Sequence, residues 1–258
     1  GSTSGAVAMG GGALDLGGTS QTTGAVTITA ASGSGDTIQN GTLTASSLAA
    51  SNTSGNAVVS AILAGSGTVT KSGAGTLTLS GANTYTGATT INAGTLQLGN
   101  ANAVQNSTVT VNSANGLAFS TGIGTFNVGG LSGSVAQALV DTGSSAVTLS
   151  VGGNNSSTTY SGVLSGAGAI AKVGTGALTL SGANTYSGGT TLNAGTVIFG
   201  NNAAFGTGAV TLNGGTIKNG GGNFTLANNF TVSGATVVDM ASNNTGLTGS
   251  ISGSAALT

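Results

Sequence analysis

The segment GAGTLTLSGANTYTGATTINAGTLQLGN, residues 73–100, returns 101 positions later as GTGALTLSGANTYSGGTTLNAGTVIFGN, residues 174–201. A wider comparison of residues 65–100 with residues 166–201 finds 23 identities in 36 positions. Both copies alternate apolar residues with threonine, and glycine and asparagine separate the alternating runs. Alternation with a period of two predicts strands with one buried face, so the repeated unit is expected to be a set of short strands joined by turns.

The same alternation continues along the rest of the chain. Pairs such as Asn40-Gly41 and Asn213-Gly214 lie between the runs and supply the positive φ angles that tight turns need. The best helical candidate, residues 134–141, is too short to change the assignment. The sequence therefore predicts an all-β chain, with strands in residues 25–29, 76–80, 95–99, 107–113, 146–151, 177–182, 209–214 and 230–238.

Composition excludes several classes of function. The 258 residues include 50 glycines and no proline, cysteine or histidine, and the net charge is −1. A chain without a basic stripe is not expected to bind nucleic acid, and a chain without an apolar run of roughly 18 residues is not expected to insert into a membrane as a helix. Neither a cofactor nor a metal site is predicted. The only charged residues are Lys71, Lys172, Lys218, Asp15, Asp36, Asp141 and Asp239.

The repeat length selects one architecture among all-β folds. A period of about a hundred residues fits four or five coils of a parallel β-solenoid, each of about 20 to 25 residues. At about 4.8 Å a coil, the chain would form roughly 11 coils and a rod roughly 50 Å long. A β-sandwich is the alternative, which the scarcity of large aromatic residues disfavours. We expect one solenoid segment, residues 1–258, with strong repeat blocks at 65–100 and 166–201 and a truncated third module at 248–258.

The pattern GSGTVTKSGAGTLTLSGANTYTGATTINAGTLQLG, residues 65–99, with its copy at residues 166–200, resembles the autotransporter-associated β-strand repeat of bacterial surface proteins. The lysine, the GAGTLTLSG core, the ANTYTG turn and the NAGTL strand all match. The resemblance implies a right-handed parallel β-helix in a passenger region that is carried outside the cell, at the bacterial surface.

An enzymatic role is not expected. Parallel β-helices that cleave polysaccharides use clustered charged residues, whereas this chain has no glutamate, arginine or histidine. Of the four aspartates, only Asp15 and Asp36 are about one coil apart in sequence. We interpret them as two stacked surface aspartates rather than as a catalytic pair.

Several residues recur at equivalent positions of the two strong blocks. Two tyrosines in the turns could stack on sugar rings, although packing of the turn is the preferred interpretation. The two lysines are expected to be solvated, with stems that cover the edge of a coil. Four asparagines are interpreted as structural markers of the repeat. The recurring residues are Tyr85 and Tyr186, Lys71 and Lys172, Asn83 and Asn184, and Asn92 and Asn193.

Two hypotheses for function follow. The first is a non-catalytic extracellular rod, a stalk, adhesive passenger segment or fibre-forming surface protein. The alternative is a carbohydrate-binding module that uses the turn tyrosines and Asn-rich edges to bind a glycan or another cell-surface ligand. The chain has no charge or proline in its last 19 residues to protect an open coil. In the native material the segment is therefore expected either to continue into further coils of the same chain or to abut a neighbouring copy, so that the rods associate end to end.

Overall fold

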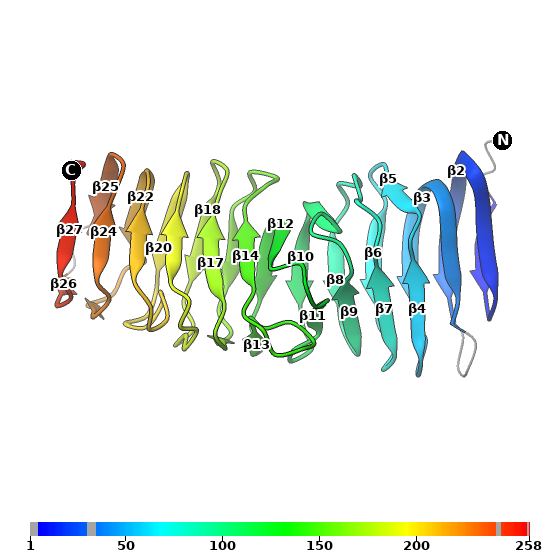
Figure 1. Ribbon diagram of the computed structural model, residues 1–258, viewed down its shortest axis with the longest axis horizontal. Helices are drawn as coiled ribbons and strands as arrows, with labels where there is room; N and C mark the ends of the chain where they lie inside the picture. Colours follow the sequence, from blue (N-terminus) through cyan, green and yellow to red (C-terminus); the bar gives the residue numbers. More distant parts are fainter. Residues whose placement is uncertain (1–4, 30–34, 241–243, 257) are drawn as a thin grey trace.

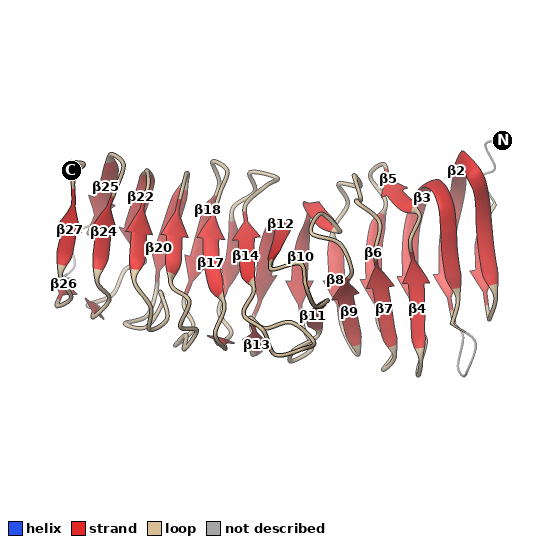
Figure 2. Cartoon of the chain, in the orientation of Figure 1, coloured by secondary structure: helices blue, strands red, loops and turns tan. Residues whose placement is uncertain are grey.

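The fold is a long stack of short strands with the two ends of the chain at opposite ends of the long axis (Figure 1). The computed structural model describes residues 5–29, 35–240, 244–256 and 258. These residues form 27 strands and no helix (Figure 2). Accordingly, no helix long and apolar enough to cross a membrane occurs among them. Residue 257, within the expected third module, lies outside the described residues.

Nearly all strand pairs are parallel and join residues about 20 positions apart, such as Leu77 with Leu96 and Thr191 with Thr211. This offset is one coil of a parallel β-solenoid, as the sequence predicted. One isolated antiparallel bridge, between Val140 and Ala146, interrupts the pattern. Following the ladders along the rod separates three stacks of strands, which we call face 1, face 2 and face 3.

Face 1 is the most continuous stack. It holds the C-terminal parts of four bent strands, which also contribute to other faces. Twelve segments stack on face 1 from Val7 to Asp239, which makes eleven turns. The strands are β1 (Val7–Met9), β2 (Ala13–Ile28), β3 (Thr37–Ala50), β6 (Thr68–Lys71), β8 (Thr89–Ile91), β10 (Val104–Val111), β12 (Thr125–Gly133), β15 (Thr158–Tyr160), β18 (Ala177–Leu180), β20 (Thr196–Phe199), β22 (Gly215–Asn219) and β25 (Thr236–Asp239).

Face 2 begins with the first residues of β2 and β3 and is continued by short strands and turns. Where face 2 has no regular β-ladder, single backbone hydrogen bonds join successive coils. Examples are the bond from Thr142 N–H to the Phe119 carbonyl, 2.8 Å, and the bond from Thr185 N–H to the Leu164 carbonyl, 2.8 Å. Its further strands are β4 (Asn56–Val59), β7 (Thr76–Leu79), β9 (Thr95–Leu98), β11 (Leu117–Phe119), β13 (Gln137–Ala138), β16 (Leu164–Ser165), β23 (Thr225–Leu226) and β26 (Gly246–Leu247).

Face 3 runs through the middle of β2 and β3 and includes the N-terminal part of β12. The turn residues 84–86 and the start of β10 occupy two of its coils. Its further strands are β5 (Ile62–Ala64), β14 (Thr148–Val151), β17 (Ala169–Lys172), β19 (Thr190–Leu192), β21 (Val210–Leu212), β24 (Phe230–Val232) and β27 (Ile251–Gly253).

The core is a narrow, packed column of stacked aliphatic residues between the three faces. In β7, Leu77 and Leu79 are fully buried while Thr76 and Thr78 are half-buried, as the alternation predicted. All six phenylalanines make ring contacts, for example Phe119 with Phe126 at 5.0 Å between centroids. Stacking of like side chains in successive coils therefore replaces the globular core that this composition could not build.

Candidate functional site

The structure contradicts the expectation that the repeated lysines are solvated. Lys71 and Lys172 are 0% and 1% exposed and point into the core, in register with Ala50 and Val151 of the preceding coils. The Lys71 ammonium donates to the Gly73 carbonyl. Burial without a carboxylate partner lowers the pKa of both ammonium groups.

The turn that follows each of these strands explains the inward position of the lysine. Lys172 Nζ donates to the carbonyl oxygens of Val173 at 2.5 Å, Gly174 at 3.0 Å and Ala194 at 3.5 Å. The ammonium thus takes up backbone acceptors that a corner would otherwise leave unpaired. The alternation of inward and outward side chains along the strand directs this lysine into the core. Hydrogen bonds to the corner carbonyls offset the cost of burying its ammonium group.

The turn tyrosines are also inside the rod. Tyr85 and Tyr186 are 3% and 0% exposed, so neither ring is available to stack on a sugar. Tyr85 Oη lies 2.6 Å from Thr89 Oγ1, and Tyr186 Oη lies 2.5 Å from Thr190 Oγ1. Burial raises the pKa of Tyr85 to about 12 and also raises that of Tyr186. The tyrosine version of the carbohydrate-binding hypothesis is therefore wrong.

Asn83 and Asn184 join three successive coils through one side chain each. Asn83 Oδ1 accepts from Leu63 N–H at 2.8 Å, and its Nδ2 donates to the Ala103 carbonyl at 2.9 Å. Asn184 makes the equivalent bonds to Leu164 N–H, 2.8 Å, and the Ala204 carbonyl, 2.7 Å. Both asparagines are 1% exposed. Each side chain replaces ladder bonds that the irregular turn does not make.

Asn92 and Asn193 lie on the outside instead. Asn92 Oδ1 accepts from Asn112 Nδ2 at 3.0 Å, and Asn193 Oδ1 accepts from Asn213 Nδ2 at 2.8 Å. Both bonds are exposed and join neighbouring coils at a corner. The sequence marked all four asparagines as repeat residues but did not distinguish the buried pair from the exposed pair.

The two repeat blocks lie on different sides of the rod. The first block places its lysine strand, β6, on face 1, and the second block places the equivalent strand, β17, on face 3. Four turns after β6 the chain forms β15 on face 1, and β17 follows two faces later. The 101-residue period is therefore four and two-thirds turns, and equivalent residues of the two blocks do not share a face.

The acidic residues form no shared site. Asp15 pairs in register with Gln39, so Asp36 is not stacked on it, in contrast to the expectation. Asp15 is exposed, and hydrogen bonds from Gly17 N–H and the side chains of Gln39 and Asn40 lower its pKa. Asp36 is 0% exposed, and its carboxylate has no hydrogen-bond partner among the described residues.

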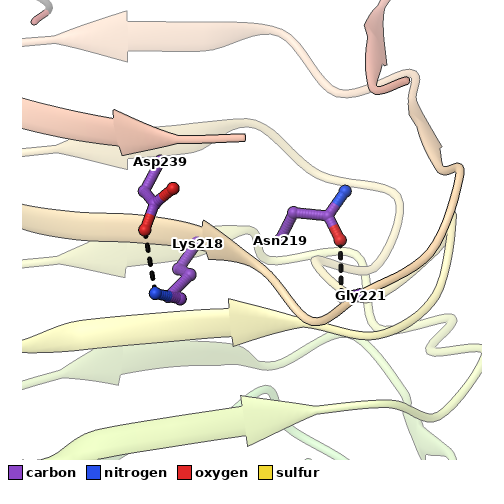
Figure 3. A network of polar contacts seen from close by, with 4 residues as sticks. All are labelled: Lys218, Asn219, Gly221 and Asp239. Carbon is purple, nitrogen blue, oxygen red and sulfur yellow. Dashed lines mark hydrogen bonds and ion pairs between the residues drawn. The ribbon is translucent and has the colours of Figure 1, made fainter. Parts of the chain in front are cut away.

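The remaining charges serve local structure. Asp141 Oδ1 accepts from the backbone N–H groups of Gly143 and Ser145 and closes a turn. Figure 3 shows the ion pair between Lys218 of β22 and Asp239 of β25, 2.9 Å apart on the surface of neighbouring coils. Within the described ranges, no group of three or more His, Cys, Asp or Glu residues could hold a metal ion.

These features define a class: a repeat protein in which the recurring residues build coils of a parallel β-solenoid. The passenger-associated-transport-repeat family matches residues 69–98, 170–199 and 217–239. Three segments of the chain are therefore similar to this repeat, in agreement with the resemblance seen in the sequence. The third match covers the end of β22 and all of β23, β24 and β25, ahead of the segment 248–258 where a third module was expected. No match to a curated protein or to a solved structure was found.

Proposed function

We propose that this chain is part of a non-catalytic extracellular rod that holds an attached segment at a distance from a bacterial surface. The support comes from the repeat residues themselves. The lysine, the tyrosine and the first asparagine of both blocks are buried, and their polar atoms bind the protein's own backbone or hydroxyl groups. Residues that recur because they hold the coils together contribute length and stiffness to the rod rather than a repeated binding surface.

The rotation of the blocks is the observation that carries the proposal. A row of ligand sites along one side requires a period that is a whole number of turns, whereas this period is four and two-thirds turns. A spacer has no such requirement, because each added block lengthens the rod whichever face it begins on.

Location at the cell surface is supported by the passenger-repeat family. The low charge, with seven charged residues in the whole chain, is consistent with a part that neither binds nucleic acid nor performs acid–base chemistry. Adhesion or fibre formation would then belong to the parts that the rod carries or to its ends.

Immunogold electron microscopy on native cells tests the proposal. Antibodies against this chain should label intact cells, with gold particles outside the outer membrane. Labelling that appears only after the cells are permeabilised would contradict an extracellular rod. An antibody to a cytoplasmic protein, which must label only permeabilised cells, is the control for cell integrity.

A further inference from the structure

A polar hollow of about 190 Å³ lies where face 3 turns into face 1, and all of its lining residues except Val173 are outside the strong repeat blocks. Its lining includes the side chains of Gln105, Asn106, Asn127 and Ser150, together with Val128 and Val173. Four neighbouring coils therefore contribute to it, from β10, β12, β14 and the residue after β17.

A bulge in β10 creates the hollow. Val104 pairs with Val128 and Thr108 pairs with Gly130, so four residue steps on β10 face two steps on β12. The extra residues project from the ladder at the corner. A Cβ atom on Gly129 would lie 2.6 Å from the backbone carbonyl carbon of Asn106, so only glycine allows this crossing. Bulges of this kind commonly redirect side chains beside binding sites.

The following loop holds the bulge in place. Asn154 Nδ2 donates to Thr108 Oγ1 at 2.9 Å across two coils. Gly153 passes so close to the bulge that a Cβ atom there would lie 2.8 Å from the Gln105 carbonyl oxygen. The hollow is thus fixed on both sides by close backbone contacts.

Much of the hydrogen-bonding capacity around the hollow is unused. Among the described residues, the side chains of Asn106 and Ser150 have no hydrogen-bond partner. Gln105 uses only its Nε2, which donates to the Asn83 carbonyl at 2.9 Å, and Asn127 uses only its Nδ2, which donates to Asn102 Oδ1 at 2.6 Å. Donors and acceptors are therefore both available, next to valine side chains.

We propose that this hollow binds one residue of a neutral, polyhydroxylated ligand, a sugar unit of an uncharged glycan. Amide and hydroxyl groups match sugar hydroxyls as donors and acceptors, and the valines offer an apolar contact for the ring C–H groups. No charged side chain lines the hollow, so an ionic ligand would lose hydration without gaining a counter-charge. The inference is independent of the proposed function, because a rod does not require a binding site.

The same set of residues does not recur 101 positions further along the chain, which separates this site from the structural repeat. The positions 101 residues further on from Asn106 and Ser150 are Thr207 and Ile251. Asn228, which corresponds to Asn127, is buried and donates to the Gly206 and Gly208 carbonyls. The hollow therefore gives this segment one site rather than a series.

Saturation-transfer difference NMR of the 258-residue chain tests the inference. The probes are neutral oligosaccharides, namely maltotriose, cellotriose and N-acetylchitotriose, with trigalacturonic acid as the charged comparison. We expect saturation transfer to at least one neutral trisaccharide. Asn106→Ala and Ser150→Val should each weaken binding at least about tenfold, the effect of about 1.4 kcal/mol of lost hydrogen bonding.

The matched control is Thr207→Ala, 101 positions further along the chain from Asn106, which should leave binding unchanged. Asn106→Ala removes no hydrogen bond within the described structure, so its thermal unfolding should match that of the unaltered chain. The proposal is overturned if no neutral trisaccharide binds, if only the acidic one binds, or if Asn106→Ala and Ser150→Val bind as well as the unaltered chain.

Discussion

Asparagine serves two different purposes in the repeat, and the direction of the side chain decides which. Asn184 points inward and bonds the backbone of the coils on both sides. Asn193 points outward and bonds only the next asparagine of a surface ladder. An inward amide replaces backbone hydrogen bonds that water cannot reach, whereas an outward amide competes with solvent for the same bond.

Substitution of these two asparagines should therefore have unequal effects. Asn184→Leu leaves the Leu164 N–H and the Ala204 carbonyl unpaired inside the rod and should lower the free energy of unfolding by about 2–5 kcal/mol. Asn193→Ala should lower it by less than about 1 kcal/mol. Urea unfolding followed by circular dichroism provides the comparison, and equal losses would contradict the internal role of Asn184.

Alkaline pH should destabilise the protein through its buried tyrosines. Burial raises the pKa of Tyr85 and Tyr160 to about 12 and also raises that of Tyr186. The unfolded chain releases these protons near pH 10, so above that pH the folded state holds more protons than the unfolded state. Stability should then fall with rising pH, by up to about 1.4 kcal/mol per unit for each tyrosine.

The buried lysines have the opposite effect below pH 10. Their pKa values are lowered in the folded state, so the unfolded chain binds more protons as pH approaches about 10.4, and stability rises with pH in that range. The melting temperature should therefore pass through a maximum near pH 9 to 10 and decrease above it. A melting temperature that does not fall between pH 10 and pH 11.5 would be inconsistent with buried, protonated tyrosines.

At the scale of the element, the corners depend on glycine where successive coils touch. Gly195 has φ +70°, and a Cβ atom there would lie 2.4 Å from the Gly174 carbonyl oxygen of the coil before it. Gly122 has φ +81°, but a Cβ atom there would meet no atom within 4 Å. The two positions separate backbone strain from stacking.

Alanine at these positions should reveal the cost of stacking. Gly122→Ala carries only the cost of a positive φ, about 1–2 kcal/mol. Gly195→Ala adds a collision between coils and should cost at least about 3 kcal/mol in total. Thermal unfolding of the two variants gives the comparison. If Gly195→Ala lowers the stability no more than Gly122→Ala does, the close contact between coils does not make alanine at position 195 more costly.

The strands could be predicted from the sequence because their alternation is local. Seven of the eight predicted segments each overlap one strand, whereas residues 230–238 span two strands, β24 and β25, with a corner between them. Asn40 and Asn115 adopt the positive φ angles expected of Asn-Gly turns. The lysines and tyrosines could not be placed in the same way. Whether a residue beside a corner is buried depends on the coils above and below it, and one sequence does not specify where each coil begins.

The rotation of the blocks was not visible in the sequence for the same reason. A period of 101 residues fits four or five turns, and only the ladders show that it is four and two-thirds. The polar hollow was missed as well, since Gln105, Asn106, Asn127 and Ser150 form no motif in the sequence. A two-residue bulge brings them together, and nothing in the alternation predicts it.

At the scale of the whole molecule, β27 presents an apolar surface at Ile251. Ile251 continues an inward-facing file after Val210 and Phe230, which are 0% and 2% exposed, yet it is itself 50% exposed. We propose that the coil of a second copy stacks on this surface and extends the parallel ladders, so that rods associate end to end.

Sedimentation velocity over a range of concentrations tests this association. The unaltered chain should form larger species as concentration rises, and Ile251→Lys should remain monomeric because burying an ammonium group without hydrogen-bond partners between two coils is costly. Thr179→Lys, on the side of the rod, is the control and should associate normally. A single monomeric species of the unaltered chain at high micromolar concentration would contradict end-to-end stacking.

The central claim is that each repeat block lengthens one continuous rod, and adding a block tests it most directly. A variant with a second copy of residues 71–171 inserted after residue 171 gains one full period of four and two-thirds turns. Small-angle X-ray scattering should show a maximum dimension increased by about 22 Å with an unchanged cross-sectional radius, because each coil adds about 4.8 Å. An unchanged maximum dimension, or a larger cross-section, would contradict the account.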